Sequence, residues 1–188
     1  MKRLFFITGT ICAITIMAIV ITACGGGTST AASGASGTSN VQVLPVADNP
    51  IQNSSTTPGL EIVKAEVENN VDPGTSKDIS DRLQLSVKNT SGQKMDNLEI
   101  FYRLTDSTTR ASEGYYQKLD GLSLAPGETK TIYFDNQTGP GHYPENKYSM
   151  YRTSTNEVVF TIELSAPGFK LAAGDAKKDA GTGEKQGE

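Results

Sequence analysis

Few residues of this chain could carry chemistry, and His142 is the first to consider. It is the only histidine, and it stands in the run Gly139-Pro-Gly-His-Tyr-Pro, whose composition is that of a loop. A serine hydrolase would need it between a serine nucleophile and a carboxylate, but the chain has no Gly-x-Ser-x-Gly elbow. A zinc site needs several nitrogen and sulfur ligands, which a single histidine without a free cysteine does not supply. We therefore expect His142 to be a solvated loop residue, with no catalytic role and no zinc.

Carboxylates are the other candidates for chemistry. Asp72, Asp78 and Asp81 lie close together in the sequence and could bind Ca²⁺, which takes oxygen ligands. Scattered loop carboxylates are usually only solvated, however. Glycoside hydrolysis would need two acids flanking a substrate cleft, which so small a domain rarely provides. The expectation is a non-enzymatic protein without metal or cofactor.

The N-terminus carries the most specific pattern in the chain. Lys2 and Arg3 precede an apolar run from Leu4 to Ile21, and Thr22-Ala23-Cys24 follows. A basic start, an apolar stretch and small residues at its end are typical of an export signal. An uncleaved transmembrane helix is the alternative, because about 20 apolar residues span a bilayer. The glycine-rich sequence after Cys24 argues against that helix, since membrane anchors more often carry charged or aromatic flanks.

The run Ile21-Thr22-Ala23-Cys24 resembles the lipobox of bacterial lipoproteins. The resemblance implies that residues 1–23 are a signal peptide and that Cys24 is the lipid attachment site. Its sulfur would carry a diacylglyceryl group, with fatty acyl chains such as palmitate, and Cys24 would be the first residue of the mature protein. Two or three acyl chains make a durable anchor, whereas one gives marginal binding. The expected location is the extracytoplasmic face of a cell membrane, in either an outer membrane or a single-membrane envelope.

Charge limits the classes of partner. Removing Lys2 and Arg3 from the 17 basic residues leaves 15 against 21 acidic residues, a formal charge of −6. A mildly acidic surface argues against nucleic acid, whose binding requires clustered Lys and Arg. With Cys12 in the signal and Cys24 alkylated, no disulfide is possible, so the core alone must stabilise the fold.

Composition divides the mature chain into three parts. Residues 24–59 are mostly Gly, Ser, Thr, Ala and Asn, and are expected to form a lipidated flexible tether because they bury too little apolar surface to order themselves. Residues 60–169 are expected to form one folded domain. Residues 170–188 mix Gly, Ala, Lys, Asp and Glu, and are expected to be a disordered tail.

Within residues 60–169 the apolar residues recur at a spacing of two, which is the period of a half-buried strand. The clearest runs begin at Leu83, Leu98, Ile132 and Val158. A phase shift at Ile62-Val63 predicts a β-bulge. Weaker strands are expected near residues 114–119 and 148–152. About seven short strands separated by Gly-, Pro- and Asn-containing turns predict an antiparallel all-β sandwich of the immunoglobulin-like type.

Four segments resemble bacterial extracytoplasmic immunoglobulin-like domains, notably the FxLYD type. They are Leu83-Gln-Leu-Ser-Val-Lys-Asn-Thr-Ser, Asp96-Asn-Leu-Glu-Ile, Leu104-Thr-Asp and Leu122-Ser-Leu-Ala-Pro-Gly-Glu-Thr. The likeness covers roughly residues 60–134. It implies the fold and no reaction.

Binding is the remaining class of function. The alternation places Phe101 and Tyr133 on outer sheet faces, and exposed aromatic side chains are a common recognition device. Together with Tyr115 and Tyr116 they form the candidate binding surface. The predicted function is a lipid-anchored cell-surface protein that presents its domain to an extracytoplasmic protein partner, with no prediction of oligomeric state. The alternative is a glycan- or small-ligand-binding module that serves a transporter or a cell-wall enzyme.

Overall fold

The computed structural model describes residues 43–68, 75–76 and 83–181. The predicted signal peptide, Cys24, residues 24–42 of the predicted tether, and Asp72, Asp78 and Asp81 lie outside the described residues. The elements along the chain are β1 (Leu60–Glu66), β2 (Leu83–Asn89), β3 (Glu99–Asp106), β4 (Ser112–Lys118), β5 (Thr129–Phe134), β6 (His142–Tyr143), α1 (Met150–Thr153), β7 (Val158–Ser165) and β8 (Ala172–Lys178).

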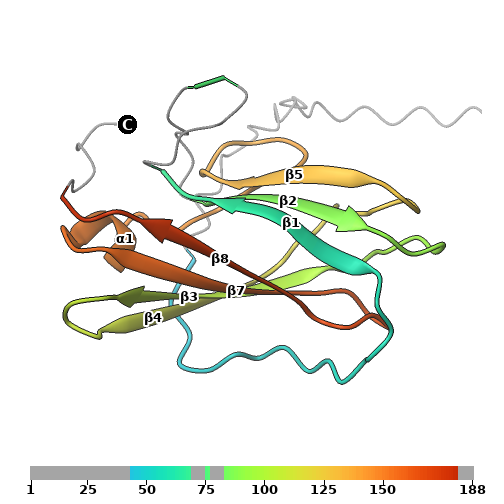
Figure 1. The fold of residues 1–188 in the computed structure, drawn as a ribbon, viewed down its shortest axis with the longest axis horizontal. Helices are drawn as coiled ribbons and strands as arrows, with labels where there is room; N and C mark the ends of the chain where they lie inside the picture. The colour runs from blue at the N-terminus through green and yellow to red at the C-terminus, as the bar shows by residue number, and fades with distance from the viewer. Residues whose placement is uncertain (1–42, 69–74, 77–82, 182–188) are drawn as a thin grey trace, which may run out of the picture. The chain divides into compact units, whose positions relative to one another are not determined.

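Two four-stranded sheets pack face to face (Figure 1). One sheet has the order β1-β2-β5-β6 and the other has the order β4-β3-β7-β8. All neighbouring strands are antiparallel except β5 and β6, which run parallel. The predicted antiparallel all-β sandwich is therefore confirmed, with eight described strands where about seven were expected.

The predicted alternation is what fills the space between the sheets. On β2, Leu83, Leu85 and Val87 are buried while the residues between them are half-buried. Tyr102 of β3 lies at the centre, with its ring centroid 5.4 Å from that of Tyr115 and 5.7 Å from that of Phe134. Large apolar side chains at a spacing of two thus give each sheet one dry face.

Two local predictions had different outcomes. The bulge is confirmed, because the pairing of β1 with β2 shifts register between Ile62 and Lys64. The strand expected near residues 148–152 is wrong, because that segment forms the single-turn helix α1. The helix turns Tyr151 inward, where its ring meets that of Phe160 edge-on at 5.5 Å. Tertiary packing has therefore overridden the local pattern.

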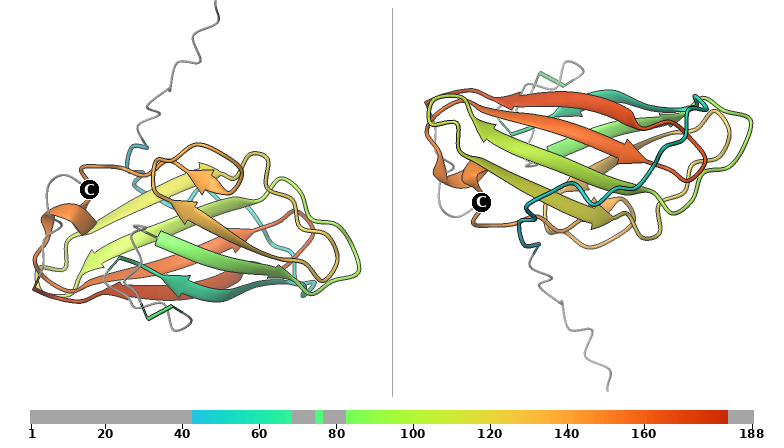
Figure 2. Two further views of the ribbon diagram at one scale, coloured as in Figure 1. Left: turned by 90° about the horizontal axis from the view of Figure 1, so that it is seen from above. Right: turned by 90° about the horizontal axis from the view of Figure 1, so that it is seen from below.

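The expected flexible tether includes a segment that is part of the fold, which corrects its boundary. Residues 43–59, here called the N-terminal strap, cross the outer face of the sheet that contains β3, β4 and β7 (Figure 2). The Val46 N–H donates to the Gly114 carbonyl at 2.8 Å, and the Asn49 amide donates to Glu163 at 2.6 Å. Asn53 donates to the Phe169 carbonyl at 2.9 Å. These hydrogen bonds, with buried Val43 and Ile51, hold a segment whose composition predicts disorder.

The expected disordered tail is also wrong in its first part. Ala172–Lys178 forms β8, paired antiparallel with β7 at the end of its sheet. Ala172, Ala176 and Lys178 alternate inward and are buried. The Lys178 amine donates to the Ser154 carbonyl and lies 5.6 Å from the centroid of the Tyr151 ring. This strand has the period of two, but its inward side chains are two alanines and a lysine, which do not show the period in hydropathy.

Candidate interaction surface

The four aromatic residues predicted to form one surface are separated by the structure. Tyr115 is a core residue, with only 1% of its surface exposed. Its hydroxyl donates to Glu113 at 2.6 Å and accepts from the Asn146 amide at 3.1 Å. Burial, followed by the hydrogen bond to Glu113, raises the pKa of the Tyr115 phenol well above its usual range. Its place in the candidate surface was a wrong prediction.

Phe101 points to the outer face of its sheet, as predicted, but it is only 5% exposed. Its ring lies close to Gly114, where an added Cβ would be 3.0 Å from the ring, and the Arg103 guanidinium lies 5.5 Å from the ring centroid. Arg103 also reaches the Ala47 carbonyl of the N-terminal strap at 3.5 Å. Because the strap crosses this face, Phe101 is not available to a partner, and its predicted exposure is wrong.

Tyr116 stays on the outer face of the same sheet and is half-buried. Its hydroxyl donates to Glu99 at 2.7 Å. Burial and this hydrogen bond raise the pKa of Tyr116 to about 12. The phenol therefore stays neutral at physiological pH, as a donor to Glu99.

Tyr133 belongs to the opposite sheet, where it stacks on His142. The two ring centroids are 5.0 Å apart with an angle of 19° between the ring planes. His142 Nδ1 lies 2.8 Å from an Asp135 carboxylate oxygen, which fixes the orientation of the imidazole. His142 begins β6, so its prediction as an ordinary loop residue is wrong. One feature of the sequence points to this arrangement. It is the Gly139-Pro-Gly turn, after which the chain runs beside β5.

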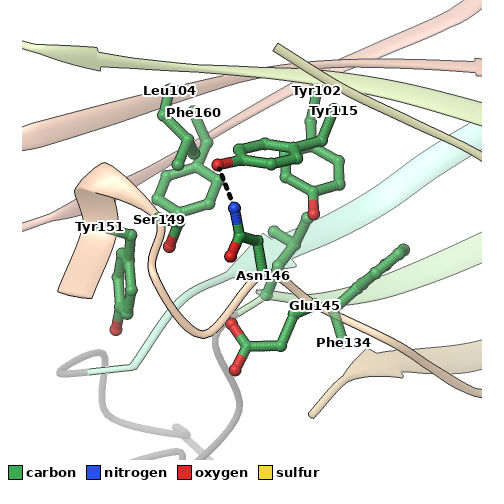
Figure 3. A pocket seen from close by; sticks show the side chains of 10 residues that line it. Tyr102, Leu104, Tyr115, Phe134, Glu145, Asn146, Ser149, Tyr151 and Phe160 are labelled. Atoms are coloured by element: carbon green, nitrogen blue, oxygen red, sulfur yellow. Dashed lines mark hydrogen bonds between the residues drawn. The ribbon is translucent and has the colours of Figure 1, made fainter. Parts of the chain in front are cut away.

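A small cavity lies between the sheets, beside α1 (Figure 3). Its wall includes the rings of Tyr102, Phe134 and Phe160, and the Asn146 amide that meets the Tyr115 hydroxyl. The cavity measures about 10 Å³, which is near the lower limit for one water molecule. It is therefore a packing gap rather than a site for an organic ligand.

A second polar cluster pins the loops at one end of the sandwich. The Asp106 carboxylate accepts from the Ser154 hydroxyl at 2.6 Å, from the Asn156 amide at 3.0 Å and from the Thr109 N–H at 2.7 Å. These donors, with Ser154 contributing most, hold the pKa of Asp106 well below its usual range. The bonds from Ser154 and Asn156 join the end of β3 to the segment before β7, and the bond from Thr109 closes the turn after β3, so the carboxylate has a structural role.

The end strands of the two sheets are the remaining candidates for an interaction surface. β8 pairs with β7 on one side, and no described strand pairs with its other side. Ala173, Asp175 and Lys177 alternate outward along it and are exposed. β1 ends the other sheet and carries Val63, which is 56% exposed at the bulge. Unpaired edge strands offer backbone donors and acceptors to another chain.

Neither a metal-binding cluster nor a membrane-spanning helix occurs among the described residues. Residues 43–68, 75–76 and 83–181 hold no group of three or more His, Cys, Asp and Glu that could bind a metal ion. None of the helices in that part of the chain is long and apolar enough to cross a bilayer.

Comparison with known proteins adds no assignment. No family model matches the chain, and no curated protein sequence matches it. The likeness to FxLYD-type domains stays a prediction from the motifs.

Proposed function

We propose that this protein is a lipid-anchored lipoprotein of the extracytoplasmic membrane face that acts without catalysis and presents its sandwich to a protein partner. The sequence of residues 1–24 supports the anchor, since it combines an export signal with a cysteine in a lipobox-like run. Confining the domain to one surface would raise its effective concentration toward a partner on the same surface.

One observation carries the choice of a protein partner. The aromatic residues of the expected surface do not meet in a hollow, because Tyr115 lies in the core and Phe101 is only 5% exposed. The sandwich instead offers edge strands, among them β1 and β8, each of which pairs with a described strand on one side only. Edge strands recognise extended protein segments through backbone hydrogen bonds, whereas a small ligand requires a concave pocket.

Lipidation is tested by labelling. Cells that express the full chain are fed a fatty acid carrying a clickable group, and wild type is compared with Cys24→Ala. Wild type should take up label and be processed, while Cys24→Ala should remain an unlabelled precursor. Cys12→Ala is the matched control and should label normally, because its position falls inside the predicted signal. Equal labelling of Cys24→Ala would contradict the anchor.

The partner is tested by crosslinking on intact cells, followed by mass spectrometry of what is attached to the labelled lipoprotein. One protein recovered in near-stoichiometric amount is expected. Recovery of no protein at all, from cells in which the lipoprotein is labelled and exposed, would contradict a role in protein–protein interaction.

The Tyr133–His142 stack favours a second candidate, a glycan-binding module. A flat aromatic pair on an outer sheet face, beside the hydroxyls of Ser86 and Thr131, combines an apolar platform with hydrogen-bonding groups. Glycan-array binding that is lost in Tyr133→Ala and kept in Tyr116→Ala would support this function over the first.

A further inference from the structure

The exposed edge of β8 carries a charge pattern that is complementary to itself. Asp175 and Lys177 both face outward, one on each side of Ala176. Edge charges usually protect a strand from pairing with other chains. Here the two charges have opposite signs and are two residues apart. In one particular pairing of two β8 strands, each aspartate therefore lies opposite a lysine, and the charges attract.

When a two-fold axis relates two identical antiparallel strands, the residue that lies n positions before the axis in one strand is opposite the residue that lies n positions after it in the other. If the axis passes at Ala176, Asp175 of one copy lies opposite Lys177 of the second copy, and the reverse pair follows by symmetry. An axis at Asp175 would set that carboxylate against itself, and an axis at Lys177 would set two amines together. The sequence of β8 therefore selects one register. Cross-strand pairs of opposite charge stabilise a sheet, and like charges destabilise it.

We propose that β8 is a homodimerisation strand that pairs antiparallel with β8 of a second copy of this chain, in the register centred on Ala176. The two β4-β3-β7-β8 sheets then continue into one another through backbone hydrogen bonds. Lys177 already contacts Glu157 at 2.9 Å and Asp179 at 3.5 Å, so Asp175 of the second copy joins an existing array of alternating charges. The partner at this edge is thus a second copy of the chain. This dimer rests on the proposed function in one respect, which is that membrane anchoring would concentrate the two copies.

The test uses the full chain with two different affinity tags, co-expressed and extracted from membranes in mild detergent. Wild-type copies should co-purify. Asp175→Lys paired with itself sets four lysines along the seam, and Lys177→Asp paired with itself sets four aspartates there. Each should co-purify about tenfold less than wild type, since two attractive pairs become two repulsive ones.

Co-expression of the two variants distinguishes a charge effect at the β8 pair from loss of folding. A copy with Asp175→Lys and a copy with Lys177→Asp set lysine opposite aspartate at both positions, so co-purification should return toward the wild-type level. The double variant Asp175→Lys/Lys177→Asp should also pair with itself. Either recovery shows that the variants have folded, because pairing requires an intact β8. Lys147→Asp, an exposed charge reversal in the segment before α1, is the matched control and should co-purify like wild type.

Three results would overturn the proposal. They are wild-type copies that do not co-purify, Asp175→Lys copies that self-associate at the wild-type level, and failure of both the mixed pair and the double variant to recover. Labelling of Cys24 is scored on the same extracts, so a failed anchor and a failed β8 pairing give different readings. Crosslinking to another protein without self-association would leave the proposed function in place and remove this inference.

Discussion

The side-chain amide of Asn89 donates to the carbonyl of Leu124 at 3.0 Å, across 35 residues of sequence. It also donates to the Gln93 carbonyl at 2.7 Å, and its oxygen accepts from the N–H and the hydroxyl of Ser91. The end of β2 is thereby fixed to the Ala125-Pro-Gly turn that leads into β5. The Asn-x-Ser and Leu-x-Pro-Gly-Glu motifs of the sequence are two halves of one hydrogen-bonded corner.

Asn89→Ala should lower the free energy of unfolding by about 2 to 3 kcal/mol, because it removes the four hydrogen bonds of a fully buried amide and leaves the Ser91 N–H without its acceptor. Urea unfolding followed by circular dichroism measures the loss. Gln93→Ala is the control, since its side chain is exposed and its hydrogen bonds to Asn89 and Ser91 use the backbone, and it should stay within about 0.5 kcal/mol of wild type. An Asn89→Ala protein as stable as the control would contradict the role of this corner.

Gly114→Ala should loosen the N-terminal strap. The added Cβ would lie 3.0 Å from both the Phe101 ring and the Val46 carbonyl oxygen, so one of them must move. Hydrogen exchange of the Val46 amide, which donates to Gly114, should become faster while amides in β7 stay protected. Gly92→Ala is matched to it, because a Cβ there meets nothing within 4 Å, and it should exchange like wild type. Unchanged protection in Gly114→Ala would argue against the strap contact.

Asp106 predicts a pH dependence of stability. Its pKa is depressed in the folded state, so its stabilising effect is complete above the unfolded value of about 3.9 and is lost as the pH falls toward the folded value. The stability gap between wild type and Asp106→Asn should therefore be widest near neutral pH and narrow as the pH falls from about 5 to 2. Urea midpoints at a series of pH values test this. Ser154→Ala, which removes the strongest donor, should show a smaller change in the same direction, whereas a gap independent of pH would contradict the assignment.

Ending the chain after Lys170 should abolish cooperative unfolding, because it removes β8 and uncovers the edge of β7. Ending it after Gly181 keeps every described strand and should preserve the cooperative transition. The pair of truncations distinguishes the observed β8 from the disordered tail expected from composition. A cooperative fold without β8 would favour the tail.

The sequence predicts the strands whose inward residues are large. On β2, β3, β5 and β7 the spacing of leucine, isoleucine and aromatic residues indicates both the strand and its buried face. β8 could not be predicted in this way, because its buried residues are Ala172, Ala176 and Lys178. Taken together, these residues differ little in hydropathy from the exposed residues between them. The strap escapes it because its attachment depends on Asn49 and Asn53 finding distant partners.

The candidate surface was harder to predict than the fold. Tyr115 and Tyr116 are adjacent, so one must face the core and the other must not, and the flanking residues do not say which. The alternation correctly sets Phe101 opposite Tyr102, but the covering of the outer face depends on a segment more than 40 residues earlier in the chain. The stack of Tyr133 on His142 requires β6, a two-residue strand whose parallel pairing leaves no period in the sequence.

The position of the strap also determines how the domain would respond to force. Tension applied through an anchor at Cys24 would reach the Val46–Gly114 contact before any strand of either sheet. That contact is an isolated bridge at the edge of β4, so it would peel open one bond at a time, while β1 stays held along its whole length by β2. Releasing residues 43–59 would add roughly 55 Å of chain to the linker. The strap would thus detach first under tension and lengthen the linker, while both sheets of the sandwich stay folded.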